Sequence, residues 1–194
     1  TNPRKGPSFL NILIPILLII VVAWGVLSFL RSHMGPPKIP GQIIELKVGA
    51  VLPDLELVGL DGQKTLLSAS QKKVILINFW ATWCEACMDE MPSLVQLREK
   101  FSSQGFEVFG VNLDEKPTQA VASTAAKFGM RFPNFSDADG KLGDAFDVHA
   151  IPLSVIIDSS RKVLDFVAGE RDWMAPSFTA KMTAWLQAGA QPNR

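Results

Sequence analysis

Residues 73–101 read KVILINFWATWCEACMDEMPSLVQLREKF, in which a strand-like run and a helix-like run meet at two cysteines. The run KVILINF, residues 73–79, is apolar and rich in β-branched side chains, which is typical of a strand buried on both faces of a sheet. Apolar residues then recur every three or four positions up to a glycine: Met91, Leu94, Leu97, Phe101 and Gly105. This spacing predicts an amphipathic helix that ends at the glycine. The cysteines therefore lie between a central strand and a helix.

The flanking sequence predicts the other elements of a mixed sheet. Residues 48–67 contain two strand-like runs broken at Asp61-Gly62, a dipeptide that favours a tight hairpin turn. By similar patterns we expect strands at residues 106–112, 153–158 and 163–168, and helices at residues 118–128 and 173–186, the last with Phe178, Met182 and Trp185 on one face. This order of elements, with a strand hairpin before the final helix, implies an α/β fold with mixed strand directions.

The overall composition is that of a globular protein. The 194 residues are 47% apolar and 20% charged, which excludes a disordered tail or a collagen-like fibre. Two cysteines are too few for a disulfide-stapled scaffold or a four-thiolate zinc site. Residues 41–194 contain 15 basic and 19 acidic side chains, a balance of −4. We expect no nucleic-acid partner, because that role needs a clustered basic face.

Residues 9–30 predict a membrane anchor. They read FLNILIPILLIIVVAWGVLSFL, 22 residues without a charge, and as a helix they would extend roughly 33 Å, enough to cross a bilayer. A cleaved signal peptide is the alternative, but it would end in small residues, and the chain continues with RSH at residues 31–33. We therefore expect a short tail at residues 1–8, an uncleaved anchor at 9–30, a linker at 31–41 and one domain at 42–194.

The spacing of the two cysteines favours redox chemistry. Cys84 and Cys87 fall in the first predicted turn of the helix, where the sulfurs would share one face and the helix N-terminus would favour a thiolate. We assign Cys84 as the attacking thiol and Cys87 as the resolving thiol of a disulfide exchange. The alternatives are a structural disulfide, a pair of metal ligands or two core cysteines. So short a disulfide loop would add little stability, and zinc lacks partners, because His33 and His149 are the only histidines.

Two segments resemble a known family. Residues 78–87, NFWATWCEAC, followed by Glu90-Met91-Pro92, are similar to the active site of the thioredoxin superfamily, specifically the membrane-anchored extracytoplasmic reductases of the TlpA, ResA and DsbE/CcmG type. Residues 139–158 resemble the second signature of that family, in which a cis proline faces the cysteines. The resemblance covers residues 48–187. It implies a thioredoxin-like fold, with a central mixed sheet flanked by helices, and a cis bond before Pro152.

The resemblance also implies roles for individual residues. Glu90 matches an acidic residue of the relatives and is a candidate proton acceptor for Cys87, the alternative being a solvated charge near the start of the helix. Thioredoxin itself carries a buried acid where this chain has Asn78, so its proton handling cannot be copied from thioredoxin. The backbone of Ile151, beside Pro152, would pair with an extended substrate segment.

Aromatic side chains and the remaining histidine give further expectations. Trp83 and Trp80 would shield the disulfide and offer a flat apolar docking surface, although Trp80 is equally compatible with the core. His149 precedes Pro152 by three residues, and we interpret it as a loop residue rather than a metal ligand. We expect no cofactor and no bound metal.

Glu85, between the cysteines, favours one direction of electron flow. A carboxylate beside Cys84 disfavours its thiolate, which destabilises the reduced form and lowers the reduction potential. We therefore predict a disulfide reductase that acts on disulfide-containing proteins, with its domain on the periplasmic or other extracytoplasmic side of a bacterial inner membrane. By resemblance, the substrate would be apocytochrome c or a maturation factor, and the electrons would come from a membrane thiol donor. Ala150 and Leu153 depart from residues often found in the relatives, which leaves substrate choice open.

Two alternative functions come from other classes. One is a copper-binding metallochaperone that uses Cys84, Cys87 and His149, although such proteins more often separate the cysteines by three residues. The other is a peroxiredoxin-like peroxidase, which shares the upstream pattern of residues 48–67 but needs a different motif around its reactive cysteine.

Overall fold

The computed structural model describes Val22, Trp24 and residues 43–189. The predicted membrane anchor at residues 9–30 lies outside the described residues apart from Val22 and Trp24, and so does the predicted linker. Within the described part of the chain, no helix combines the length and apolar character needed to cross a membrane.

Residues 43–189 contain seven strands, four α-helices and two short 3-10 helices. The strands are β1 (Glu56–Gly59), β2 (Lys64–Leu66), β3 (Val74–Trp80), β4 (Phe106–Asn112), β5 (Asn134–Ser136), β6 (Leu153–Asp158) and β7 (Val163–Ala168). The α-helices are α2 (Glu85–Phe101), α3 (Pro117–Phe128), α4 (Lys141–Ala145) and α5 (Pro176–Ala188), with short 3-10 helices η1 (Leu67–Ala69) and η2 (Ser102–Gln104). The expected strands and the helix after the cysteines are confirmed.

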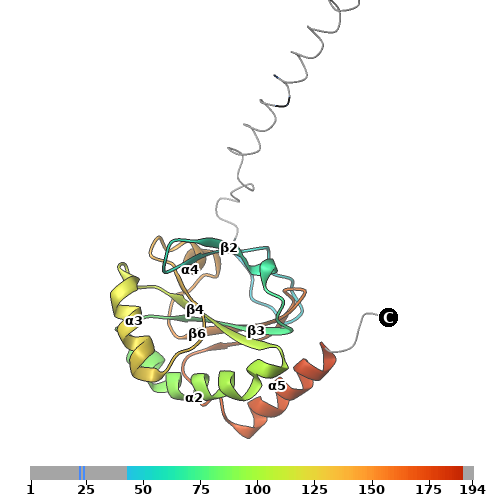
Figure 1. Ribbon diagram of the computed structural model, residues 1–194. Helices are drawn as coiled ribbons and strands as arrows, with labels where there is room; N and C mark the ends of the chain where they lie inside the picture. The colour runs from blue at the N-terminus through green and yellow to red at the C-terminus, as the bar shows by residue number, and fades with distance from the viewer. Residues whose placement is uncertain (1–21, 23, 25–42, 190–194) are drawn as a thin grey trace, which may run out of the picture. The chain divides into compact units, whose positions relative to one another are not determined.

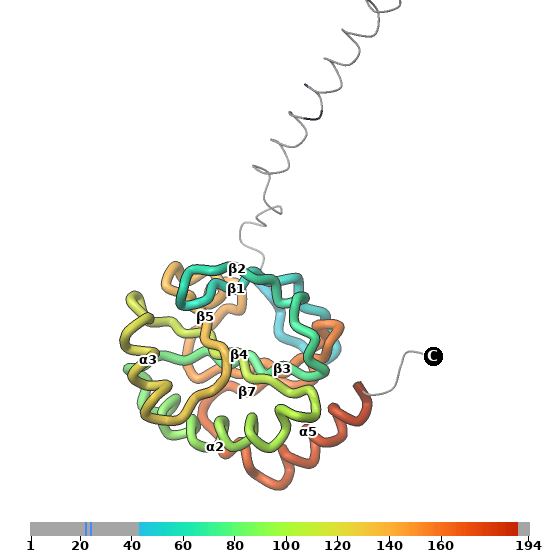
Figure 2. The backbone as a smooth tube through the Cα atoms, viewed as in Figure 1, coloured from blue at the N-terminus to red at the C-terminus, as the bar shows by residue number. Residues whose placement is uncertain are grey.

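The strands form one mixed sheet in the order β2-β1-β5-β4-β3-β6-β7. Strand β3 is central, parallel to β4 and antiparallel to β6, and all of its residues are buried. Its side chains alternate between two cores, with Leu76 and Trp80 in the one that α2, α3 and α5 cover, and Ile75 and Phe79 in the other. Helices α2 and α5 lie together on one side of the sheet and α4 on the other (Figures 1 and 2). The cysteines thus follow the central strand.

The final helix begins later than predicted. It starts at Pro176 rather than Trp173, because a proline suits the first helical turn and keeps the residue before it, Ala175, out of the helical conformation (φ −49°, ψ 134°). Phe178 and Met182 are buried as expected, but the next buried residue is Leu186, and Trp185 is only half-buried. Trp173 therefore belongs to the loop before α5, where it is fully buried.

Two short elements were missed. Strand β5 has three residues, too few to display an alternating pattern. Helix α4 has five residues with Gly143 among them, which is a poor helix former. A buried carboxylate stabilises α4 instead: Asp137 accepts hydrogen bonds from the backbone N–H groups of Leu142 at 2.8 Å and Gly143 at 2.7 Å.

Replacing Gly110 by alanine is expected to destabilise the sheet beside β3. A Cβ atom at this β4 position would lie 2.9 Å from Trp80 Nε1 and closer still to Asn134 Oδ1, so buried groups must shift, at a cost of about 1–3 kcal/mol. Chemical denaturation of the oxidised protein measures the loss. Gly189→Ala is the matched control, because its added Cβ meets ordinary contacts of 3.5 Å. Equal midpoints for the two variants would contradict the prediction.

Candidate active site

Cys84 stands at the first position before α2 and caps it. Its backbone is extended (φ −88°, ψ 106°), and its Sγ accepts a hydrogen bond from the backbone N–H of Cys87 at 3.1 Å. The two sulfurs form a disulfide of 2.09 Å. Cys84 is 7% exposed and Cys87 is completely buried. Of the two, Cys84 is therefore the residue that a partner can reach, and its sulfur faces the N–H groups that would stabilise a thiolate.

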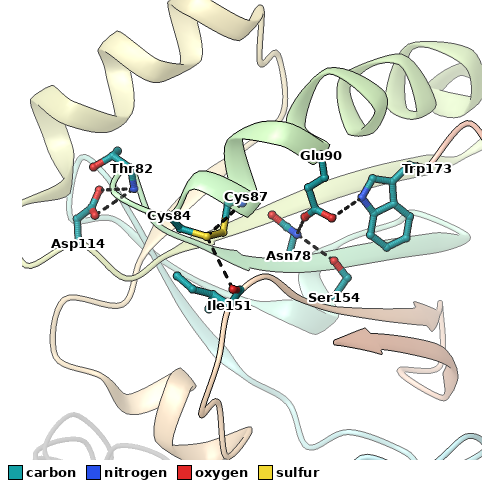
Figure 3. Close-up of a disulfide and its surroundings, with 9 residues drawn as sticks. All are labelled: Asn78, Thr82, Cys84, Cys87, Glu90, Asp114, Ile151, Ser154 and Trp173. Atoms are coloured by element: carbon teal, nitrogen blue, oxygen red, sulfur yellow. Dashed lines mark hydrogen bonds between the residues drawn. A yellow bond between two sulfur atoms is a disulfide. The ribbon is translucent and has the colours of Figure 1, made fainter. Parts of the chain in front are cut away.

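The turn before Cys84 is held by a buried carboxylate. Asp114, which follows β4, accepts a hydrogen bond from the backbone N–H of Thr82 at 3.2 Å, as Figure 3 shows. The tryptophans near this turn have different environments. Trp83 is 71% exposed, whereas Trp80 is completely buried as the last residue of β3. Trp80 therefore cannot form part of an exposed docking surface; it packs in the same core cluster as the two cysteines, in agreement with the alternative that it is a core residue.

The segment before β6 lies against the cysteine pair. The peptide bond between Ile151 and Pro152 is cis, which confirms what the resemblance implied. The carbonyl oxygen of Ile151 lies 3.8 Å from Cys84 Sγ, and in Figure 3 it is below the start of α2. Pro152 is buried and Ile151 is half-buried. The structure therefore brings Ile151, which is distant in the sequence, to the sulfur of Cys84, and Pro152 follows it in the chain.

Glu90 is buried, not solvated. It is 2% exposed and lies on the same face of α2 as Cys87, one turn later. Its carboxylate accepts hydrogen bonds from Asn78 Nδ2 at 2.9 Å and from the indole Nε1 of Trp173 at 3.0 Å (Figure 3). The alternative of an exposed charge near the helix start is excluded by this burial.

The environment of Glu90 raises the pKa of its carboxyl toward neutral pH. Burial raises the pKa of this carboxyl to about 7, against the opposing hydrogen bonds from Asn78, Trp173 and the backbone N–H of Arg171. The charge of Glu170 also raises the pKa. A carboxyl with such a pKa can both accept and release a proton at neutral pH, which is what acid–base catalysis requires.

Three further residues complete this site, although no sequence pattern predicted that packing would bring them together. Asn78 on β3 lies opposite Ser154 on β6, and its Nδ2 donates to Ser154 Oγ at 2.9 Å. A polar residue within the apolar run of residues 73–79 was the available signal for Asn78. Trp173 had no local signal, because 83 residues separate it from Glu90 and only the packing of its loop brings them together.

Two other residues that the sequence analysis considered, Glu85 and His149, are exposed to solvent. The side chain of Glu85 is exposed, so water and salt screen its charge from Cys84. His149 is also exposed, and its Nε2 lies 3.1 Å from Asp147 Oδ1. Among the residues that the structure describes, no cluster of three or more His, Cys, Asp or Glu side chains is arranged to hold a metal ion.

Comparison with known proteins finds relatives over most of the described chain. The profile of the AhpC/TSA family matches residues 48–166. The thiol-disulfide oxidoreductase ResA of Bacillus subtilis is 32% identical over 154 residues, covering 79% of this chain and 82% of the relative. ResA of Geobacillus kaustophilus is 34% identical over 122 residues, covering 63% and 70%. A Chlorobium tepidum structure, assigned as the thiol:disulfide interchange protein DsbE, has a TM-score of 0.65 at 31% identity and covers 73% of this chain and 99% of that chain.

Proposed function

This chain belongs to the AhpC/TSA family and has a thioredoxin-like α/β fold, and we propose that within this family it is a reductase of protein disulfides. Its relatives are thiol-disulfide oxidoreductases by name, and its own Cys84–Cys87 disulfide is the group for that exchange. The same pair, Trp83 and the Ile151-Pro152 segment form the proposed site.

The proposed reaction transfers two electrons in two steps. The thiolate of Cys84 attacks one sulfur of a substrate disulfide, forms a mixed disulfide and releases the other substrate sulfur, which takes up a proton. The sulfur of Cys87, once deprotonated, then attacks Cys84 Sγ. This forms the Cys84–Cys87 disulfide and releases the second substrate sulfur as a thiolate, which takes up a proton from water. A dithiol donor reduces the pair again and is itself oxidised to a disulfide.

Glu90 is the proposed proton acceptor for the second step. Cys87 is buried away from water and must lose its proton before it attacks. Glu90 lies one helical turn from it, on the same buried face, and its raised pKa of about 7 leaves it partly ionised at neutral pH. The proton would pass to this carboxylate and leave it in the next reduction.

One observation carries the direction of the reaction: a buried acid, Glu90, stands next to the cysteine pair. A strong oxidant stabilises its reduced form by stabilising a thiolate. A carboxylate in a buried site next to the cysteines opposes a second negative charge there. Glu85 acts in the same sense, more weakly because it is exposed. The N–H groups at the start of α2 favour the Cys84 thiolate, but these two carboxylates oppose it. The thiolate is therefore less stabilised than in a strong oxidant, which favours a lower reduction potential.

Equilibration of the full chain in detergent with glutathione and dithiothreitol series tests the proposed direction. Alkylation of free thiols followed by mass measurement gives the reduced fraction. We expect a potential nearer the value of about −270 mV typical of a thioredoxin-like reductant than the value of about −120 mV of a strong oxidant. A potential near the oxidant's would refute the reductase proposal. Tight stoichiometric copper binding without insulin-reductase activity would instead favour the metallochaperone.

The substrate, location and partners belong to the same proposal. An extended substrate segment would pair with the backbone of Ile151, beside Trp83, whose exposed ring offers an apolar contact. Residues 9–30 would anchor the chain in a bacterial inner membrane, with residues 42–194 on the periplasmic side. We propose apocytochrome c or a maturation factor as substrate and a membrane thiol protein as electron donor. A domain with no spare cysteine suits that oxidising compartment.

A further inference from the structure

A buried hydrogen-bond acceptor beside the redox pair has no donor in the disulfide state. Asn78 is 1% exposed. The two N–H groups of its amide serve two partners, Glu90 Oε1 and Ser154 Oγ, each at 2.9 Å. Its oxygen, Oδ1, has no hydrogen-bond partner. Buried acceptors are rarely left unpaired in proteins, because the loss of water destabilises them. A donor that exists only in the reduced state would explain why this oxygen has no partner in the disulfide state.

The partners of the amide nitrogen determine where the oxygen points. Because Nδ2 faces Glu90 and Ser154, Oδ1 must face the other side of the amide, and in Figure 3 it lies on the side toward Cys87. Cys87 and Glu90 are both on the buried face of α2, one turn apart. When Glu90 is ionised, a flipped amide would set Oδ1 against its carboxylate, where two acceptors would repel each other.

We propose that Asn78 Oδ1 accepts a hydrogen bond from the thiol of Cys87 when the pair is reduced. The sulfur of Cys87 carries no hydrogen in the disulfide. When a dithiol donor reduces the pair, two electrons and two protons break the S–S bond and give two thiols. The new S–H of Cys87 is a donor that is completely buried, and Asn78 supplies the acceptor it needs.

Asn78 is therefore a positioning residue that favours the reduced form of the pair. Its hydrogen bond would hold the Cys87 thiol near Glu90, the proposed proton acceptor, because the same amide donates to Glu90 Oε1. The inference rests on the proposed function in one respect only, that the pair cycles between dithiol and disulfide. It does not depend on the direction of the physiological reaction.

A redox equilibrium with glutathione tests the inference through Asn78→Leu, which removes the acceptor at similar volume. We expect the equilibrium to shift toward the disulfide by about three- to tenfold, the range of a single hydrogen bond, or about 15–30 mV for this two-electron couple. The control is Asn134→Leu, the same substitution at a β5 amide whose Oδ1 is also buried and without a partner but which is not part of the site. It should leave the equilibrium unchanged, and an equal shift in both variants would overturn the inference.

A second comparison separates the role of Asn78 Oδ1 as a hydrogen-bond acceptor from the effect of Asn78 on Glu90. In a Glu90→Gln background the carboxylate is absent, so a shift that acts through its charge would disappear. We expect Asn78→Leu to shift the equilibrium in that background by a similar factor. Complete loss of the shift there would mean that Asn78 acts only through Glu90, which would overturn the assignment of Cys87 as its donor.

A spectroscopic measurement tests the inference in a chain that keeps Asn78. It therefore does not depend on the folding of an Asn78 variant. In Cys84→Ala the only thiol left is that of Cys87, so the infrared S–H stretching band belongs to one group. We expect that band at the lowered frequency of a hydrogen-bonded thiol, and a band at the frequency of a free thiol would overturn the inference. A high reduction potential of the unaltered chain would refute the reductase proposal without moving this band, so the two failures are distinguishable.

Discussion

Replacement of Cys87 by alanine is expected to stop turnover and to leave the chain in a mixed disulfide through Cys84. The sulfur of Cys84 is at the surface end of α2, while Cys87 is completely buried. A substrate disulfide therefore meets Cys84 first. Without the second sulfur nothing inside the protein displaces the substrate, and turnover should fall about a hundredfold or more, because each cycle needs both thiols.

Single-turnover mixing of the reduced variant with insulin, followed by non-reducing electrophoresis, measures this result. A covalent adduct should accumulate with Cys87→Ala and should be absent with the matched control Cys84→Ala. The same variant, expressed in cells, should retain its natural substrate for identification by mass spectrometry. Adducts through Cys87 in the Cys84→Ala variant would reverse the assigned roles. Peroxide consumption that Cys87→Ala leaves intact would instead favour the peroxidase alternative.

The predictable part of the fold came from regular, strongly apolar segments. Residues 74–80 and 106–112 are buried on both faces, so their composition alone indicates central strands. The start of α5 was placed three residues early because Trp173 continues the apolar pattern of the helix, although its loop, not the helix, buries it. Apolar periodicity cannot distinguish a tryptophan buried by a loop from one buried by a helix, since both place an aromatic ring in the core.

The predictable part of the site was the part carried by local sequence. The positions of Cys84 and Cys87 follow from the junction of one strand with one helix. The burial of Glu90 does not, because it depends on Asn78 from β3 and Trp173 from the loop before α5. A carboxylate in the first turns of a helix is ordinarily solvated, and only long-range packing makes this one an internal group.

Glu90→Gln is expected to remove a large pH dependence of stability. The pKa of Glu90 is raised by burial from 4.5 to about 7 in the folded protein, so the folded state binds this proton more tightly than the unfolded chain does. The contribution of this bound proton to the unfolding free energy is therefore fully present below pH 4.5 and is lost as pH rises through about 7. The difference corresponds to about 3 kcal/mol of unfolding free energy at 1.36 kcal/mol per pH unit.

Denaturant titrations of the oxidised protein between pH 4.5 and 8 measure this loss, since the disulfide leaves no thiol to ionise. The unfolding free energy of the unaltered chain should fall with pH by about 3 kcal/mol more than that of Glu90→Gln. Glu85→Gln is the matched control, because Glu85 is an exposed carboxylate on the same helix, and its profile should follow the unaltered chain. Parallel profiles for the Glu90 variant and the unaltered chain would show that burial does not retain the proton.

The same substitution connects the buried proton to catalysis. If Glu90 receives the proton of Cys87, resolution of the mixed disulfide should accelerate as pH rises through about 7, where the carboxylate forms. Glu90→Gln should slow that step by roughly 10²-fold, the lower range for a positioned general base, while the first attack by Cys84 stays unchanged. Stopped-flow measurement of each step separates the two. A variant that slows both steps equally would point to a distorted helix rather than a missing base, because distortion would displace both sulfurs together.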